Sequence, residues 1–236
     1  MKRGMFMKTI GLIGGMSWES SLEYYRIINE EVKAKLGGLH SAKCILYSVD
    51  FEEIERCQAE GDWESSGKLL GDAALSLEKA GAEMILICTN TMHKVIVYIE
   101  EKVSLPILHI ADSTAKQIQK SKISTVGLLG TKYTMEQDFY KTRIKSNGIK
   151  VLIPNDEDRK VINKVIYEEL CLGEIQQSSR DYYKKVIKGL VDDGAEGIIL
   201  GCTEIGLLVK PEDSKVPLFD TAVIHAIESV NMALEK

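Results

Sequence analysis

The sequence predicts an α/β protein built from two similar lobes, each a parallel four-stranded sheet flanked by helices. The first observation is a repeat of the glycine-containing segment T-I-G-L-I-G at residues 9–14, which returns as T-V-G-L-L-G at residues 125–130. The second is that short apolar runs alternate with longer amphipathic stretches along the whole chain. This alternation is typical of parallel strands that are buried on both faces and linked by helices.

Two further matches extend the repeat. G-A-E at residues 81–83 leads into an apolar run, and G-A-E at residues 194–196 does the same 113 positions later. L-P-I-L at residues 105–108 corresponds to V-P-L-F at residues 216–219, 111 positions later. Because the order is the same in both halves, we expect lobe one at residues 1–104 plus 214–236 and lobe two at residues 105–213. A pseudo-twofold axis would relate the lobes, with the active site in the cleft between them.

Each expected strand is an apolar run of the length usual for a buried strand. The eight strands are expected at residues 9–13, 42–49, 84–88, 107–110, 125–129, 150–153, 197–200 and 218–219.

The expected helices fill the gaps between these strands, and several of their ends carry chemical signals. They are expected at residues 18–36, 63–80, 92–101, 113–119, 134–146, 159–172, 178–193 and 222–234. Gly81 and Gly194 stand where a helix stops before a strand, and glycine favours the left-handed conformation found there. Ser17 and Thr134 are expected to cap the helices that follow the two glycine segments.

Composition excludes several classes of protein. The net charge is −5 and the basic residues are scattered, so a nucleic-acid partner is not expected. No apolar run reaches the roughly 20 residues that cross a bilayer, so we expect no membrane association and a cytoplasmic protein. Translation could start at Met1 or at Met7, which directly precedes the first expected strand.

The five cysteines indicate free thiols. Their number is odd, the chain is long and no secretory signal is evident, so a disulfide framework is not expected. No C-x-x-C pair is present, which argues against a structural zinc site, and we expect neither a metal nor a cofactor.

Ligands of parallel α/β sheets collect at the carboxyl ends of strands, and a glycine loop ends the first expected strand. The loop at residues 11–17, which includes Met16 and Ser17, could hold a substrate carboxylate on free backbone N–H groups. Its spacing is not that of a dinucleotide-binding loop. The alternative is a tight turn that binds nothing.

Two more strand ends carry polar residues and a cysteine, at residues 88–93 and 201–204. The repeat aligns Thr89, not Cys88, with Cys202. Because side chains alternate along a strand, Cys88 should point away from the cleft if Thr89 points into it, as an ordinary buried thiol. Cys202 lies before an expected helix N-terminus, a setting that lowers a thiol pKa toward the thiolate.

Other polar residues at these ends could contact a substrate or serve the fold. Asn90, Thr91, Thr203 and Glu204 could bind the carboxylate and amine of a substrate, or cap helices. His93 lies four residues after Thr89 and could share a proton with the cleft, or be structural.

Two residues outside these strand ends are also candidates for substrate binding. Asp50, at the end of the second expected strand, could bind an amine or be a turn residue. Lys164 could pair with an acidic substrate side chain, or be a solvated helix lysine.

Three motifs resemble the cofactor-independent aspartate/glutamate racemases of the Asp/Glu/hydantoin racemase superfamily. They are G-L-I-G-G-M-S-W-E-S-S at residues 11–21, T-N-T-x-H at residues 89–93 and G-C-T-E at residues 201–204. The resemblance implies two α/β lobes, no metal or pyridoxal phosphate, and a thiol on each face of the amino acid. It also makes a homodimer the expected oligomeric state.

The first box of that family usually reads C-N-T-x-H, and Thr89 stands here in place of its cysteine. A hydroxyl is a far weaker acid than a thiol, so Thr89 cannot be a resting base at neutral pH. The resemblance then implies a racemase of aspartate or glutamate that is biased toward L-substrates, with Cys202 removing the α-proton. Three alternatives stay open: a racemase of broad specificity, a single-cysteine decarboxylase or isomerase of a small dicarboxylic acid, and a binder of small anions without catalysis.

Overall fold

The computed structural model describes residues 7–235 and contains all eight expected strands, arranged in two four-stranded parallel sheets. The first sheet has the order β2-β1-β3-β4 and the second the order β6-β5-β7-β8, so the sequence repeat is also a repeat of topology. The strands are β1 (Ile10–Gly14), β2 (Cys44–Ser48), β3 (Met84–Ile87), β4 (Ile107–Leu108), β5 (Thr125–Gly130), β6 (Lys150–Leu152), β7 (Gly197–Gly201) and β8 (Leu218–Asp220). The choice between starts at Met1 and Met7 concerns residues 1–6, which lie outside the described residues.

The chain divides into two compact units whose boundaries differ from the expected ones. Unit 1 comprises Met1–His109 and His225–Lys236, and unit 2 comprises Ile110–Ile224. The expected boundaries, after residues 104 and 213, are too early. The expected boundaries assign two strands to the wrong unit, because β4 pairs with β3 of the first sheet and β8 pairs with β7 of the second.

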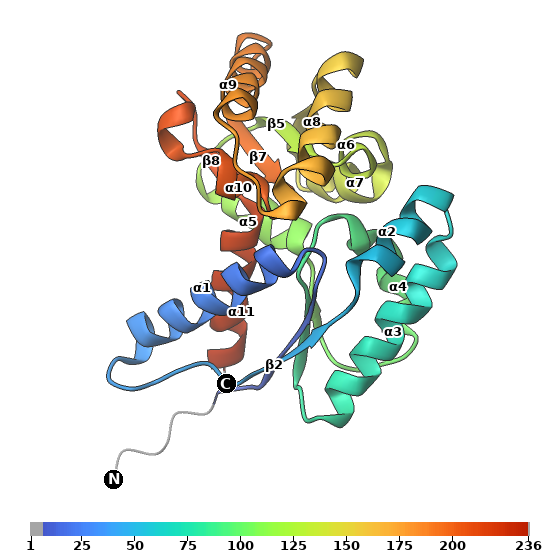
Figure 1. Ribbon diagram of the computed structural model, residues 1–236. Coiled ribbons are helices and arrows are strands. Elements are labelled where there is room, and N and C mark those ends of the chain that lie inside the picture. The colour runs from blue at the N-terminus through green and yellow to red at the C-terminus, as the bar shows by residue number, and fades with distance from the viewer. Residues whose placement is uncertain (1–6, 236) are drawn as a thin grey trace. The chain divides into compact units, whose positions relative to one another are not determined.

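Unit 1 covers both faces of its sheet with helices, and Figure 1 shows α1 and α3 on opposite sides of the strands. All described side chains of β1 and β3 are buried, which explains why both strands are continuous apolar runs. The helical elements of this unit are α1 (Trp18–Leu36), α2 (Phe51–Glu60), α3 (Trp63–Lys79), the 3₁₀ helix η1 (Thr91–Val95), α4 (Ile96–Glu100) and most of α11 (Thr221–Leu234).

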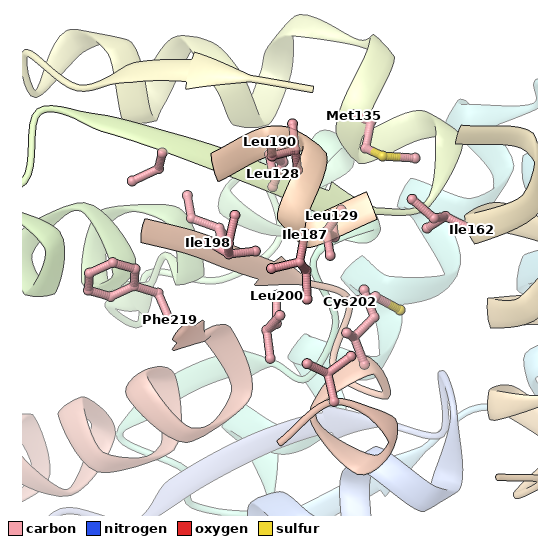
Figure 2. Close-up of a cluster of buried hydrophobic side chains, with 14 of the residues drawn as sticks. Leu128, Leu129, Met135, Ile162, Ile187, Leu190, Ile198, Leu200, Cys202 and Phe219 are labelled. Carbon is pink, nitrogen blue, oxygen red and sulfur yellow. The ribbon is translucent and has the colours of Figure 1, made fainter. Parts of the chain in front are cut away.

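Unit 2 has its own hydrophobic core, in which side chains of β5 and β7 pack with Ile187 and Leu190 of α9 and with Met135 (Figure 2). Cys202, directly after β7, belongs to this cluster. The helical elements here are α5 (Ile110–Lys120), α6 (Lys132–Glu136), α7 (Asp138–Ser146), α8 (Asp156–Glu168), η2 (Leu170–Leu172), α9 (Gln177–Asp192), α10 (Ile205–Leu208) and η3 (Pro211–Asp213).

The helix ends confirm some expectations and correct others. Gly81 and Gly194 have φ of 97° and 99°, as the helix-stop prediction requires. The expected helix at residues 134–146 is instead two helices, because Gln137 has an extended backbone. Thr131, not Thr134, caps the first of them, since its side chain accepts a hydrogen bond from the backbone N of Thr134.

Helix α2 is absent from the sequence prediction, which assigned nothing between residues 49 and 63. No helix in residues 7–235 combines the length and the apolar character needed to span a bilayer.

Candidate active site

The carboxyl ends of β1, β2 and β3 bring three of the candidate segments of unit 1 to one edge of the first sheet. The backbone N–H of Val49, after β2, donates to the Gly14 oxygen at 3.0 Å. The N–H of Cys88, after β3, donates to the Ile13 oxygen at 2.9 Å. The glycine loop, Asp50 and the Thr89 box are therefore neighbours within this unit.

The glycine loop is held by its own serines. Ser17 caps α1, as expected, by accepting from the Ser20 N–H at 3.4 Å. Ser21 donates to the Ser17 oxygen at 2.8 Å and accepts from the Gly15 N–H at 2.8 Å. The Gly15 N–H is thus used within the loop and is not available to a substrate carboxylate.

Thr89 follows β3 with its side chain almost buried, at 8% exposure. Its hydroxyl has no hydrogen-bond partner among residues 7–235, whereas its carbonyl oxygen lies 2.8 Å from His93 Nδ1. Asn90 and Thr91 are buried beside it, at the start of η1.

Cys88 takes no part in this polar edge. It is fully buried, and burial raises the pKa of its thiol well above the ordinary range. It therefore has the properties of a small apolar side chain.

Asp50 has an ordinary structural role in this structure. It is the N-cap of α2, and its Oδ1 accepts from the Glu52 N–H at 3.2 Å. This was the alternative to the predicted amine-binding role.

In unit 2 the candidate residues converge on a single carboxylate. Cys202 Sγ donates to Glu204 Oε2 at 2.9 Å, and Thr203 Oγ1 donates to the same oxygen at 2.9 Å. All three residues are buried, and Glu204 is only 1% exposed. This arrangement provides a proton acceptor in direct contact with the thiol.

The predicted depression of the Cys202 pKa is wrong. Burial raises the pKa of this thiol well above its usual range, and the negative charge of Glu204 raises it further. The helix that was expected to favour the thiolate, α10, has only four residues and begins after Glu204. Cys202 therefore rests as a thiol.

Lys164 lies on the exposed side of α8. Its Nζ is 3.6 Å from Glu168 Oε2, and its side chain is 68% exposed. This is the solvated helix pair that was the alternative to substrate binding.

Sequence reasoning missed three residues that shape these strand ends. Ser21 orders the glycine loop, Thr131 caps α6 after β5, and His109 is buried directly after β4. His109 was missed because the expected strand at residues 107–110 enclosed it, whereas β4 ends at Leu108. Within residues 7–235 no group of three or more His, Cys, Asp or Glu residues could hold a metal ion.

Comparison with known proteins agrees with this architecture. A solved structure described as a candidate Asp/Glu racemase from Yersinia pestis is 60% identical, with a TM-score of 0.89 and coverage of 97% of this chain and 100% of that one. An aspartate racemase homologue from Pyrococcus horikoshii OT3 is 38% identical, with a TM-score of 0.83 over 97% of this chain and 100% of that one.

A curated relative is the broad-specificity amino-acid racemase RacX of Bacillus subtilis. It is 27% identical over 173 residues, which are 73% of this chain and 74% of RacX. The family model for Asp/Glu/hydantoin racemases matches residues 13–228. A match over nearly the whole chain, together with two parallel sheets of one topology, makes this chain a member of the Asp/Glu/hydantoin racemase family.

Proposed function

We propose that the protein is a cofactor-independent amino acid racemase that acts on aspartate or glutamate and prefers the L-enantiomer. The observation that carries the proposal is the buried contact between Cys202 Sγ and Glu204 Oε2, at 2.9 Å. Removing an α-proton requires a base, and a buried thiol becomes a base only if a neighbouring group accepts its proton. Glu204 is in contact with that proton.

The Cys202 S–H bond breaks as its proton passes to the Glu204 carboxylate, which leaves a thiolate. The thiolate takes the α-proton from the L-substrate, and the bonding electrons stay on the substrate as a carbanion delocalised into its carboxylate. A proton returned to the same face restores the L-enantiomer, and one delivered to the opposite face gives the D-enantiomer.

Thr89 supplies the proton on the opposite face in this proposal. Its free hydroxyl can pass a proton to the carbanion while it takes another from water, so it acts as a relay and carries no lasting charge. In the reverse direction a base must remove the α-proton of the D-substrate. The Thr89 hydroxyl is too weak an acid to be ionised at neutral pH, so it cannot be that base. Because the equilibrium constant between the enantiomers is one, kcat/KM is equal in the two directions, and the Thr89 step limits both. Exchange of the α-proton should therefore be fast for the L-substrate with retention of configuration, slow or absent for the D-substrate, and conversion between the enantiomers should be slow in either direction.

The remaining polar groups are proposed to bind substrate. Met16 and Ser17 of the glycine loop, with Asn90, Thr91 and Thr203, offer backbone N–H, amide and hydroxyl groups for the α-carboxylate and amine. Asp50 and Lys164 are weaker candidates, because the Asp50 carboxylate caps α2 and the Lys164 side chain is 68% exposed and paired with Glu168. Two further proposals are a homodimer, which light scattering would test, and a cytoplasmic location.

Broad specificity is a second candidate, supported by the similarity to RacX. Narrow specificity for aspartate or glutamate is distinguished from broad specificity by measuring α-proton exchange over a panel of L-amino acids. Exchange confined to aspartate and glutamate supports the narrow function, and comparable exchange of neutral or basic amino acids supports the broad one.

The deciding experiment is incubation with L- and D-aspartate and L- and D-glutamate in deuterated water, followed by NMR and chiral analysis. We expect deuterium at the α-carbon of an L-substrate and formation of the D-enantiomer. Cys202→Ser should abolish both. Absence of exchange across the whole panel contradicts the racemase proposal, and release of carbon dioxide from a dicarboxylic acid would favour the decarboxylase.

Thr89→Cys tests the role of the opposite face. A thiol at this position can be a base, so this variant should exchange the α-proton of a D-substrate at a rate well above the wild type. The matched control is Cys88→Ser, which changes the fully buried neighbour and should leave D-substrate exchange unchanged. If Thr89→Cys exchanges the α-proton of a D-substrate no faster than the wild type, the side chain at position 89 does not reach the α-carbon.

A further inference from the structure

Three of the four histidines of this chain form one buried cluster in unit 1. His93, His109 and His225 are 2%, 5% and 0% exposed. The ring centre of His93 lies 4.3 Å from that of His109 and 5.9 Å from that of His225. Histidine is usually found at least partly exposed, so three packed imidazoles beside a strand end need an explanation.

Backbone carbonyls only accept hydrogen bonds, and this fixes which ring nitrogens carry protons. His225 Nε2 lies 2.9 Å from the Leu108 oxygen, so Nε2 is the donor. In the neutral ring, Nδ1 then accepts from the Tyr24 hydroxyl at 2.8 Å. By the same reasoning His93 Nδ1 donates to the Thr89 carbonyl at 2.8 Å.

The chain of contacts runs from the core to Thr89. Tyr24 and Leu108 hold His225, the rings of His225 and His109 contact His93, and His93 holds the backbone of Thr89. The last bond fixes the peptide that follows β3, and with it the direction of the Thr89 side chain.

The second unit shows that the fold does not require these imidazoles. By the offsets of the repeat, His93 corresponds to Gly206 and His109 to Asp220. Gly206 lies so close to Asp220 that an added Cβ would overlap a carboxylate oxygen. The same topology is therefore built without a ring at either position, and the histidines serve something particular to unit 1.

We propose that His93 is a positioning residue that determines how often the substrate is protonated on the face served by Thr89. The inference rests on the racemase function proposed above. Misplacing a reacting group by about 1 Å can slow its step by a factor on the order of 100. Loosening Thr89 should therefore slow protonation from its side and leave the Cys202 side unaffected.

The partition of products reports this directly. In deuterated water the carbanion formed from an L-substrate has two fates. Deuteron return from Cys202 gives deuterated L-product, with retention, and deuteron delivery through Thr89 gives deuterated D-product, with inversion. The ratio of inverted to retained product compares the two faces within one sample, and a general loss of folded enzyme does not change it.

Two variants separate the hydrogen bond from the shape of the ring. His93→Phe keeps a planar ring and removes the donor to Thr89. His93→Asn loses the ring but keeps a nitrogen donor near the position of Nδ1. We expect His93→Phe to lower the ratio of inversion to retention by about tenfold while L-substrate exchange stays within about twofold of the wild type. His93→Asn should keep a ratio within about twofold of the wild type.

The outcomes discriminate between the two proposals. An unchanged ratio in His93→Phe overturns the positioning role, and so does an equal fall in both variants, which would implicate the ring alone. Loss of all exchange in the wild type defeats the racemase function itself. If His93→Phe does not fold, ¹⁵N NMR of the wild type decides: Nδ1 of His93 must carry a proton that exchanges slowly with water, and a proton on Nε2 alone overturns the proposal.

Discussion

At the scale of single residues, the pair formed by Cys202 and Glu204 explains how a thiol with a raised pKa can still be reactive. Burial and the charge of Glu204 both favour the protonated thiol. The same carboxylate accepts that proton at 2.9 Å, so the thiolate can form by local transfer without release to water. Reactivity then depends on the acceptor and not on a low resting pKa.

Replacement of Glu204 separates these two effects. In Glu204→Gln the negative charge is gone, so the pKa of Cys202 should fall relative to the wild type. The acceptor for the thiol proton is also lost, so turnover of the L-substrate should fall by about 100-fold, a typical contribution of a general base. Ultraviolet titration of the thiolate, with Cys202→Ser as the blank, measures the first effect, and exchange kinetics measure the second.

Thr203→Val is the matched control for this experiment. It removes a second donor to the same Glu204 oxygen but keeps both the carboxylate and the thiol. Its kcat should fall far less than that of Glu204→Gln, and the loss of the Thr203 hydroxyl as a substrate contact should appear in KM. Full activity in Glu204→Gln would show that the thiol proton leaves by another route.

The sequence located the candidate residues better than it predicted their chemistry. The repeat aligned Thr89 with Cys202, and both lie at the carboxyl ends of equivalent strands, β3 and β7. The direction of the Cys202 pKa shift was not predictable, because it depends on how deeply the thiol is buried and on where the Glu204 side chain turns. Asp50 shows the same limit, since a carboxylate after a strand is equally suited to bind an amine or to cap a helix.

At the scale of elements, the turn after β1 depends on a close backbone approach at Gly15. This residue has a positive φ of 92°, and a Cβ added to it would overlap the carbonyl oxygen of Val49. The approach lets the glycine loop lie directly against the end of β2. Gly61 also has a positive φ, 75°, but nothing lies near the position of its Cβ.

The two glycines form a matched pair for mutation. Gly61→Ala should cost about 1 kcal/mol of unfolding free energy, the usual penalty for a positive φ. Gly15→Ala adds a backbone overlap and should cost at least about 3 kcal/mol, in the range of severe packing errors. Urea denaturation measures both, and equal costs would contradict the close approach.

Element boundaries were predictable where one signal dominated. The helix expected at residues 18–36 agrees with α1 at both ends; Ser17 was predicted as the cap at its start, and Gly37, with a φ of 73°, follows its last residue. Helix α2 was missed since Asp50 was considered as a ligand and not as its cap. The membership of β4 and β8 was also missed, because a pairing between strands cannot be recognised from the composition of a short strand.

At the scale of the whole molecule, the chain crosses between its units twice, and histidines mark both crossings. His109 is the last residue before the first crossing, and His225 is the first after the second. The hydrogen bond from His225 to Leu108 joins the two segments inside unit 1. The integrity of unit 1 therefore depends on a ring that must stay neutral, since a charged ring could no longer accept from Tyr24.

This requirement predicts a loss of stability in acid. Burial lowers the pKa of His225 from 6.5 to about 4, so the unfolded chain binds its proton more readily than the folded one. The stabilisation is complete above about pH 6.5 and declines as the pH falls toward about 4, by about 3 kcal/mol in total. His225→Gln cannot titrate, so this part of the pH dependence should disappear even if the variant is less stable at neutral pH.

The tryptophans make unit 1 separately observable. Both of them, Trp18 and Trp63, belong to unit 1, so their fluorescence during urea denaturation follows that unit. Between pH 7 and pH 4 the wild type should lose about 3 kcal/mol more than His225→Gln. His40→Gln, at an exposed histidine of the same unit, is the control and should follow the wild type. Parallel curves for wild type and His225→Gln would mean that folding leaves the pKa of His225 unchanged, which would contradict a buried neutral ring that must accept the bond from Tyr24.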